Sequence, residues 1–203
     1  MKAEQGDAEA QYQIGEWYTD LSIISKKNEE ENAVKWYLRA AEQSHTNAER
    51  CLGDCYYVGR GVAKDYEEAV KWYRKAAEKG DREAIYNMGK CYFEGKGVKQ
   101  SCEDAISWYL RGDDQGDSIC QVEIGNCYYL GNGVKQNYEE AVKWYLKALK
   151  PDCPLPPKCK IRYRLAECYR LGIGVKKDLV KAEEWQKSAK EAEDWDYEDW
   201  DEW

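Results

Sequence analysis

Nine cysteines and a single histidine are the side chains of this sequence that could carry nucleophilic, redox or metal chemistry. Zinc sites combine cysteine and histidine ligands at short spacings. No Cys-x-x-Cys pair occurs and His45 stands alone, so we predict no metal site and no cofactor. A nucleophile also needs a base beside it. His45 precedes Cys51 by about one and a half helical turns, and we expect a solvent-facing turn histidine rather than a catalytic dyad.

Four of the cysteines recur at one position of a repeated pattern, two residues after a Gly or after Ala166. They are Cys55, Cys91, Cys127 and Cys168. That position falls on the apolar face of a predicted helix, where a thiol acts as a small apolar side chain. We therefore predict buried free thiols and no enzyme, with a cysteine-dependent enzyme as a remote alternative. Cys153 and Cys159 bracket a proline-rich loop, and a local disulfide between them stays open.

The pattern itself is a repeat with a period of 36 residues, visible in Trp36, Trp72, Trp108 and Trp144. Pairs of glycines follow the same period, for example Gly95 and Gly97. The outer units are less regular than the central ones, as the ends of a stacked array require. The predicted units span residues 7–43, 46–80, 81–116, 117–150 and 158–190, which together form a domain over residues 3–190.

Each unit contains the sequence signals of two helices. In the third unit apolar residues recur at helical spacing from Ala84. Asp81 precedes them as a candidate N-cap, and the glycines end the helix. The second helix of the preceding unit follows Asp65, with Glu68 three residues later. No strand-like alternation competes, so we predict an all-α fold.

The repeated residues resemble the Sel-1-like repeat family, a branch of the tetratricopeptide-like solenoids. The resemblance rests on the motif LGDCYYVGRGV at residues 52–62, then Asp65 and AVKWYRKAA at residues 69–77. It implies a right-handed α/α superhelix whose first helices line the concave side, and a role as a scaffold for other proteins. The sequence departs from the family pattern at Ala166, which replaces Gly, at Gln186, which replaces Tyr, and in the first unit, which lacks the loop glycines.

If the first helices line a concave groove, three rows of side chains point into it. These rows vary from unit to unit while the buried face stays constant. Aromatic anchors beside polar groups are typical of peptide-binding surfaces. The alternative is that the aromatic residues pack against a neighbouring unit. The candidate groove residues are Arg50, Asp54, Tyr57, Tyr86, Lys90, Phe93, Val122, Asn126, Tyr129, Tyr163, Glu167 and Arg170.

The net charge of −8 resides in the last 13 residues. Residues 1–190 contain 31 basic and 31 acidic side chains, whereas residues 191–203 contain eight acids and no base. A neutral body and a pI near 5.0 argue against nucleic-acid binding by bulk charge. No apolar run is long enough to span a membrane.

The acidic segment, residues 191–203, also carries four aromatic residues: Trp195, Tyr197, Trp200 and Trp203. Helical spacing reaches Ala192, and beyond Asp194 the pattern is no longer clearly helical. Three hypotheses remain open for this tail. It could be a disordered solubilising end, a cap on the last unit, or a ligand that docks in a groove of its own or of a neighbouring chain.

We predict a protein-interaction module that binds a peptide or a helix of a partner protein in its concave groove. Self-assembly through the array ends or the tail is the alternative. Residues 3–10 repeat the pattern of residues 77–84, the junction between two units. We therefore expect either a fragment of a longer repeat protein or a naturally truncated first unit. The sequence does not indicate a cellular compartment.

Overall fold

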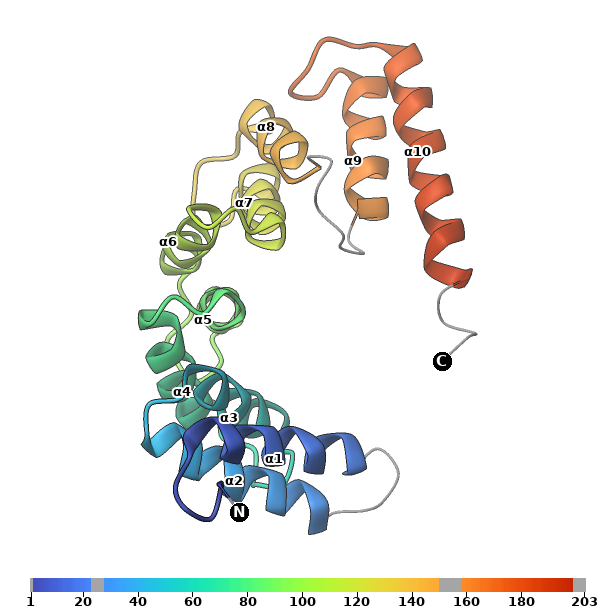
Figure 1. Ribbon diagram of the computed structural model, residues 1–203. Helices are drawn as coiled ribbons and strands as arrows, with labels where there is room; N and C mark the ends of the chain where they lie inside the picture. Colours follow the sequence, from blue (N-terminus) through green and yellow to red (C-terminus); the bar gives the residue numbers. More distant parts are fainter. Residues whose placement is uncertain (1, 23–27, 150–157, 199–203) are drawn as a thin grey trace. The chain divides into compact units, whose positions relative to one another are not determined.

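The computed structural model describes the backbone of residues 2–22, 28–149 and 158–198 and the side chains of residues 2–20, 28–149 and 160–191. These residues form helices and contain no strand, which confirms the predicted all-α class. The helices, labelled in Figure 1, are α1 (Ala8–Ser22), α2 (Asn28–Glu42), α3 (Thr46–Val58), α4 (Tyr66–Glu78), α5 (Arg82–Glu94), α6 (Cys102–Asp113), α7 (Ser118–Leu130), α8 (Tyr138–Ala148), α9 (Lys158–Leu171) and α10 (Leu179–Glu198).

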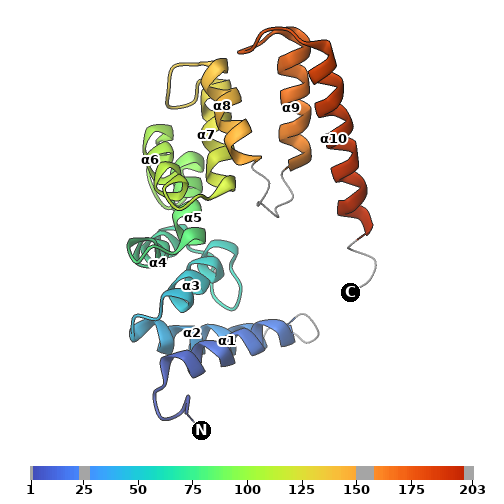
Figure 2. The ribbon, with the colours of Figure 1, turned by 45° about the horizontal axis from the view of Figure 1, so that its top comes forward.

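The chain divides into two compact units, Met1–Trp108 and Tyr109–Trp203, and the boundary falls inside α6. In the first unit α1 packs on α2, α3 packs on α4, and α2 and α4 also contact the helix that follows each of them. In the second unit α7 packs on α8 and α9 packs on α10. Figures 1 and 2 both show α9 and α10 side by side. Each pair corresponds to one predicted repeat.

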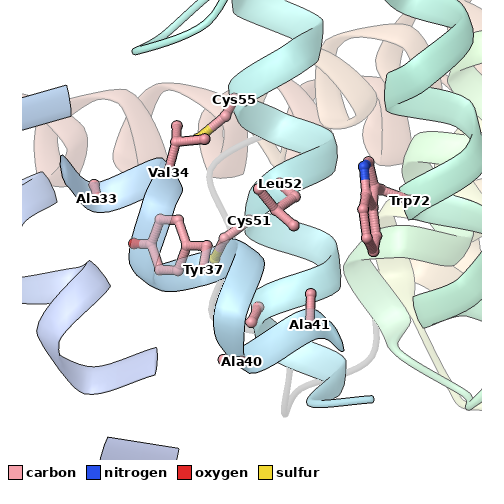
Figure 3. Packing of buried hydrophobic residues seen from close by; sticks show 10 residues of the cluster. Ala33, Val34, Tyr37, Ala40, Ala41, Cys51, Leu52, Cys55 and Trp72 are labelled. Carbon is pink, nitrogen blue, oxygen red and sulfur yellow. The ribbon is translucent and has the colours of Figure 1, made fainter. Parts of the chain in front are cut away.

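The core of the first unit shows how the repeat period becomes packing. Tyr37 and Leu52 are fully buried, and Trp72 is 9% exposed. They come from α2, α3 and α4 and belong to one hydrophobic cluster, in which Leu52 of the middle helix carries the contact from one helix to the next (Figure 3). Burying a side chain of this size stabilises the fold by about 1.5–3 kcal/mol. One apolar stripe per helix therefore suffices to join neighbouring repeats.

In three helix pairs, α1 with α2, α3 with α4 and α7 with α8, a tyrosine ring lies directly on a glycine of the partner helix. A Cβ atom built on Gly125 would stand 2.6 Å from Cε1 of Tyr145. Gly15 and Gly53 face the rings of Tyr37 and Tyr73 in the same way. No side chain fits in that space, because real Cβ contacts of this length are essentially absent. The glycine is required by the close approach of the ring, since its own backbone is ordinary helix.

The last repeat supports this pairing, because both partners are replaced there together. Ala166 replaces the glycine and Gln186 replaces the tyrosine. Ala166 is 2% exposed in the core, and Gln186 accepts a hydrogen bond from Arg170 at 2.6 Å. Without the ring, the space for a Cβ atom is available. The two departures from the family pattern therefore have one physical cause.

The loop glycines serve the stacking of successive repeats. Gly97, after α5, has φ 71°, and a Cβ atom there would overlap the backbone carbonyl of Tyr66 at the start of α4. Gly174, after α9, approaches the carbonyl of Tyr138 at the start of α8 in the same manner. Only glycine combines a left-handed backbone with so close an approach. Each such loop is therefore seated on the preceding helix pair.

The helix ends agree with the predicted caps. The carboxylate of Asp81 accepts from the backbone N–H of Ala84 at 2.7 Å, and Asp65 accepts from that of Glu68 at 3.0 Å. At the other end of the chain α10 continues to Glu198, past the point where the sequence pattern stopped being clearly helical. The division into a repeat domain over residues 3–190 and a tail over residues 191–203 stays a prediction. None of the described helices is long and apolar enough to cross a membrane.

The contact between glycine and tyrosine makes a quantitative prediction. We expect Gly125→Ala to lower the free energy of unfolding by about 1–3 kcal/mol, because the new methyl group overlaps the Tyr145 ring. Urea unfolding followed by circular dichroism measures the loss. The last repeat supplies the reverse experiment, in which Gln186→Tyr is compared with and without Ala166→Gly. The pairing would be contradicted if the change in the free energy of unfolding of the double variant were no more favourable than the sum of the changes in the two single variants.

Candidate protein-interaction surface

The predicted groove residues are held by the tyrosines that the helix pairs bury. The hydroxyl of Tyr73 donates to Asp54 at 2.7 Å, and that of Tyr145 donates to the side-chain oxygen of Asn126 at 3.0 Å. In the first repeat the hydroxyl of Tyr37 reaches Glu16 in the same way. The ring thus packs on the glycine while its hydroxyl holds the very next residue. One tyrosine connects the core to the surface row in each of these three pairs.

A second contact ties the same residue to the following repeat. The amide of Asn87 donates to Asp54 at 3.3 Å, and the guanidinium of Arg164 donates to Asn126 at 2.5 Å. Cys51 occupies the equivalent position of α3 and points its thiol at Glu16, 3.8 Å away. The repeat pattern did not lead us to predict these contacts. Their common position was visible in the sequence, because each of the three residues stands directly before the buried residue that opens the repeat motif, such as Leu52.

In the first unit Arg50 and Asp54 are bound into an ionic network. The guanidinium of Arg50 lies 3.2 Å from Asp54, 2.9 Å from Glu83 and 3.7 Å from Asp81. The network joins α3 to the start of α5. Burial raises the pKa of Asp54, and the hydrogen bond from Tyr73 opposes that rise. Both predicted groove residues thus connect two repeats, and only part of each side chain is open to a partner.

Tyr57 is the centre of a second cluster in this unit. Its hydroxyl donates to Glu94 at 2.8 Å and accepts from Lys96 at 3.1 Å. The ring packs edge-on against Tyr66, with a centroid distance of 5.2 Å. The ammonium of Lys90 lies 5.4 Å from the ring centroid of Tyr57. The alternative that these aromatics pack inside the repeat array therefore holds for part of the ring.

Tyr129 repeats this arrangement in the second unit. Its ring packs edge-on against Tyr138 at 5.2 Å, and the guanidinium of Arg164 lies 5.1 Å from its centroid. Burial raises the pKa of both Tyr57 and Tyr129. Each ring is half-buried and bears a cation. The structure thus gives both units an amphipathic cluster on their first helices.

The remaining candidates divide into exposed, half-buried and buried side chains. Tyr86, Lys90 and Phe93 are half-buried on α5. Lys90 lies close to the Tyr57 ring, and Phe93 follows Lys90 by about one helical turn. On α9, Tyr163 is half-buried, whereas Glu167 and Arg170 are exposed. Val122 is the exception. Its side chain is 7% exposed and packs in the core of the second unit, so it cannot line a groove.

The histidine prediction was wrong in its placement. His45 is the N-cap of α3: its Nδ1 accepts from the N–H of Ala48 at 3.3 Å, and its Nε2 pairs with Glu9 at 2.9 Å. Its ring stacks on Tyr12, and the side chain is 15% exposed. Solvent does not surround it because the first repeat covers the turn. Both ring nitrogens are engaged, so His45 is not placed as a base for Cys51.

The described repeat cysteines lie in the core, as predicted. Cys55, Cys91, Cys127 and Cys168 are all buried. Burial raises the pKa of Cys51 and Cys55 to about 12 and that of Cys91 to about 11. Among the described residues no group of three or more His, Cys, Asp and Glu could hold a metal ion. The side chains of Cys153 and Cys159, and those of the four tail aromatics at 195, 197, 200 and 203, lie outside the described residues.

The raised thiol pKa values predict slow alkylation of the native protein, because the thiolate is the reactive form. We expect iodoacetamide at pH 8 to modify Cys102, which is half-buried, before Cys55 and Cys91. Mass spectrometry of the digested protein measures the order. Labelling after unfolding in guanidinium is the control and should reach every cysteine. Native-state alkylation of Cys55 or Cys91 at the rate of Cys102 would contradict the assignment of these thiols to the core.

The shifted carboxyl predicts a pH-dependent effect of Asp54→Asn. A pKa raised by folding means that the ionised form destabilises the folded chain once the pH exceeds about 4. We therefore expect the variant to gain stability relative to wild type between pH 3.5 and pH 7. Urea unfolding at both pH values measures this, and circular dichroism checks that both proteins keep their helices. A stability difference that is independent of pH would contradict it.

Solved structures and curated sequences resemble this chain at different lengths. A protective antigen of uropathogenic Escherichia coli, c5321, shares 34% identity and a TM-score of 0.83 over 94% of this chain and 39% of its own. A Sel1 repeat protein from Oxalobacter formigenes shares 34% identity and a TM-score of 0.78 over 92% of this chain and 73% of its own. Wolframin from Drosophila melanogaster is 33% identical over an alignment of 67 residues, which covers 31% of this chain and 8% of wolframin. The chain thus spans well under half of the antigen and a small part of wolframin.

The Sel1 repeat model matches the chain five times, at residues 8–45, 48–81, 82–117, 118–150 and 162–194. These matches cover most of the sequence, and each begins close to the start of the first helix of a pair or within it. The antigen and the Oxalobacter formigenes protein have the same helical repeat fold. The glycine, tyrosine and loop contacts described above are what the repeated motif encodes. The chain belongs to the Sel1 repeat family.

Proposed function

We propose that this protein binds a peptide segment of a partner protein on the amphipathic clusters of its first helices. Sel1 repeats are in general protein-interaction modules. The single observation that supports a binding site here is the cluster around Tyr57, where an aromatic ring on α3 meets Lys90 of α5 and Lys96 of the loop after α5. Phe93 is half-buried on α5, three residues after Lys90. An aromatic anchor with charge beside it is the composition of interaction hot spots.

The cluster is held in place before any partner arrives. Tyr57 is fixed by Glu94 and Lys96 through its hydroxyl and by Tyr66 through its ring. Side chains that are already ordered lose little entropy when a ligand binds. The same holds for Tyr129, which lies between Tyr138 and Arg164. The internal packing of these rings therefore supports a binding role, because it leaves a rigid face and a half-exposed surface.

The chemistry of the clusters suggests what the peptide carries. In the first unit Lys90 and Lys96 both lie within 5.4 Å of the Tyr57 ring centroid. Lys96 forms an ion pair with Glu94, whereas Lys90 lies over the Tyr57 ring and forms no ion pair within the described part of the chain. A peptide with an apolar side chain for Phe93 and a carboxylate for Lys90 would match this surface. The second unit has its own charged side chains, because Glu167 and Arg170 are exposed on α9 and offer both signs of charge.

Peptide selection tests this proposal. A phage-displayed library of random peptides is selected on the wild-type chain, and the selected peptides are titrated by fluorescence polarisation. We expect Lys90→Glu combined with Phe93→Ala to weaken binding at least about tenfold, since two central contacts are lost. Both side chains are half-buried rather than core residues, so the variant should keep its fold.

A matched control changes charge on another helix. Lys71→Glu combined with Leu38→Ala alters an exposed lysine and an exposed apolar residue of the second helices. The control should bind every selected peptide as wild type does. Equal loss in both variants, or full binding by the Lys90 and Phe93 variant with unchanged circular dichroism, would refute the assignment.

A further inference from the structure

The last repeat begins its second helix with side chains unlike those of the preceding repeats. Acidic residues occupy the first turn of α4, α6 and α8, as Glu67 and Glu68 do in α4. The first turn of α10 has no acid and opens with Leu179, Val180 and Lys181 instead. Leu179 is 56% exposed and Val180 is 68% exposed. This end of the second unit thus presents apolar and basic groups where the other repeats present carboxylates.

A pocket of about 530 Å³ lies beside this helix start. Its lining residues are Tyr169, Val175, Lys176, Lys177, Asp178 and Lys181. The only carboxylate among them is already engaged, because Asp178 accepts from the N–H groups of Val180 and Lys181, each at 3.1 Å. The ammonium of Lys181 lies 5.4 Å from the centroid of the Tyr169 ring. The pocket therefore combines three lysines with an aromatic wall and an apolar rim.

The corresponding pocket one repeat earlier has different chemistry. That pocket, of about 730 Å³, lies at the start of α8, and its lining includes Lys135, Asn137 and Glu139. Gly174 lines it as well and is seated on the carbonyl of Tyr138, so this pocket takes part in the contact between successive repeats. The pocket at the start of α10 has the same place in its repeat but carries three lysines in place of one.

The sequence contains a segment with the complementary chemistry. Residues 191–203 hold eight acidic side chains, three tryptophans and a tyrosine, and no basic side chain. Aromatic residues alternate with carboxylates there, which suits lysines set around an apolar rim. All eight excess negative charges of the chain reside in this segment. It is therefore the part of this protein best matched to the pocket.

The tail cannot reach the pocket of its own chain. The pocket lies at the beginning of α10, and this helix runs through residues 179–198, as Figure 1 shows. At a rise of 1.5 Å per residue, twenty helical residues separate the two ends by about 30 Å. The five residues after Glu198 span at most about 17 Å when extended. A tail in this pocket must therefore come from another molecule.

We propose that two copies of this chain associate through reciprocal docking, with the acidic aromatic tail of each copy in the basic pocket at the start of α10 of the other. Two α10 helices that pack antiparallel bring the tail of each copy to the pocket of its partner. A two-fold axis satisfies both contacts at once and closes the assembly. The attraction is between opposite charges near the surface, so salt weakens it.

Sedimentation velocity of the 203-residue chain tests the association. We expect a species of twice the 23.7 kDa chain mass at about 0.05 M NaCl and its dissociation at about 0.5 M NaCl. The pocket variant K176E/K177E/K181E and the tail variant D196K/E198K/D199K/D201K should each be monomeric at concentrations where wild type is a dimer. A synthetic peptide of residues 191–203 should compete with the wild-type association.

Charge exchange distinguishes this contact from a general effect of charge. Mixing the pocket variant with the tail variant restores both contacts, so the mixture should form a heterodimer. The control K35E/K71E/K143E has the same net charge as the pocket variant, reverses exposed lysines elsewhere, and should dimerise like wild type. A monomeric wild type at low salt, a dimer that survives both reversals, or a mixture that stays monomeric overturns the proposal.

Discussion

The contact of one tyrosine ring with one glycine sets the distance between the two helices in the repeats that contain it. Tyr73 on Gly53 in the first unit and Tyr145 on Gly125 in the second bring two helices so close that no Cβ atom fits between them. The ring is removed from water, and its hydroxyl donates to the side chain that follows the glycine, Asp54 or Asn126. Close packing of this kind makes cores sensitive to a single methyl group. In the last repeat Ala166 adds such a methyl group, and Gln186 replaces the ring that would clash with it.

The tyrosine hydroxyl links the packing of the core to the candidate binding surface. It holds Asp54 in one repeat and Asn126 in another, and the next repeat adds a second donor to each. The row that varies between repeats is therefore also the row that joins them. A partner would meet side chains whose positions are already fixed by the array. Such order lowers the entropic cost of binding.

Much of the fold could be predicted because the repeat multiplies weak signals. One glycine pair is poor evidence, but the same pair at a constant period, with caps at Asp65 and Asp81, specifies helix after helix. The surface was harder to predict. We predicted that Val122 lines the groove and that His45 faces solvent, and both side chains are covered instead. Helical periodicity gives the direction of a side chain but not which residues of another helix lie against it. The contacts of Arg164 and Asn87 were missed for the same reason.

The sequence by itself determined the period, the helices, their caps and the apolar stripe, since these depend on residues a few positions apart. It also determined that the net charge belongs to the last 13 residues. Only the tertiary structure decided which polar side chains bind to the neighbouring repeat, as Arg50 does, and which apolar side chains stay exposed, as Leu179 and Val180 do. Those outcomes depend on contacts between residues about 30 positions apart. Local spacing carries no information about such contacts.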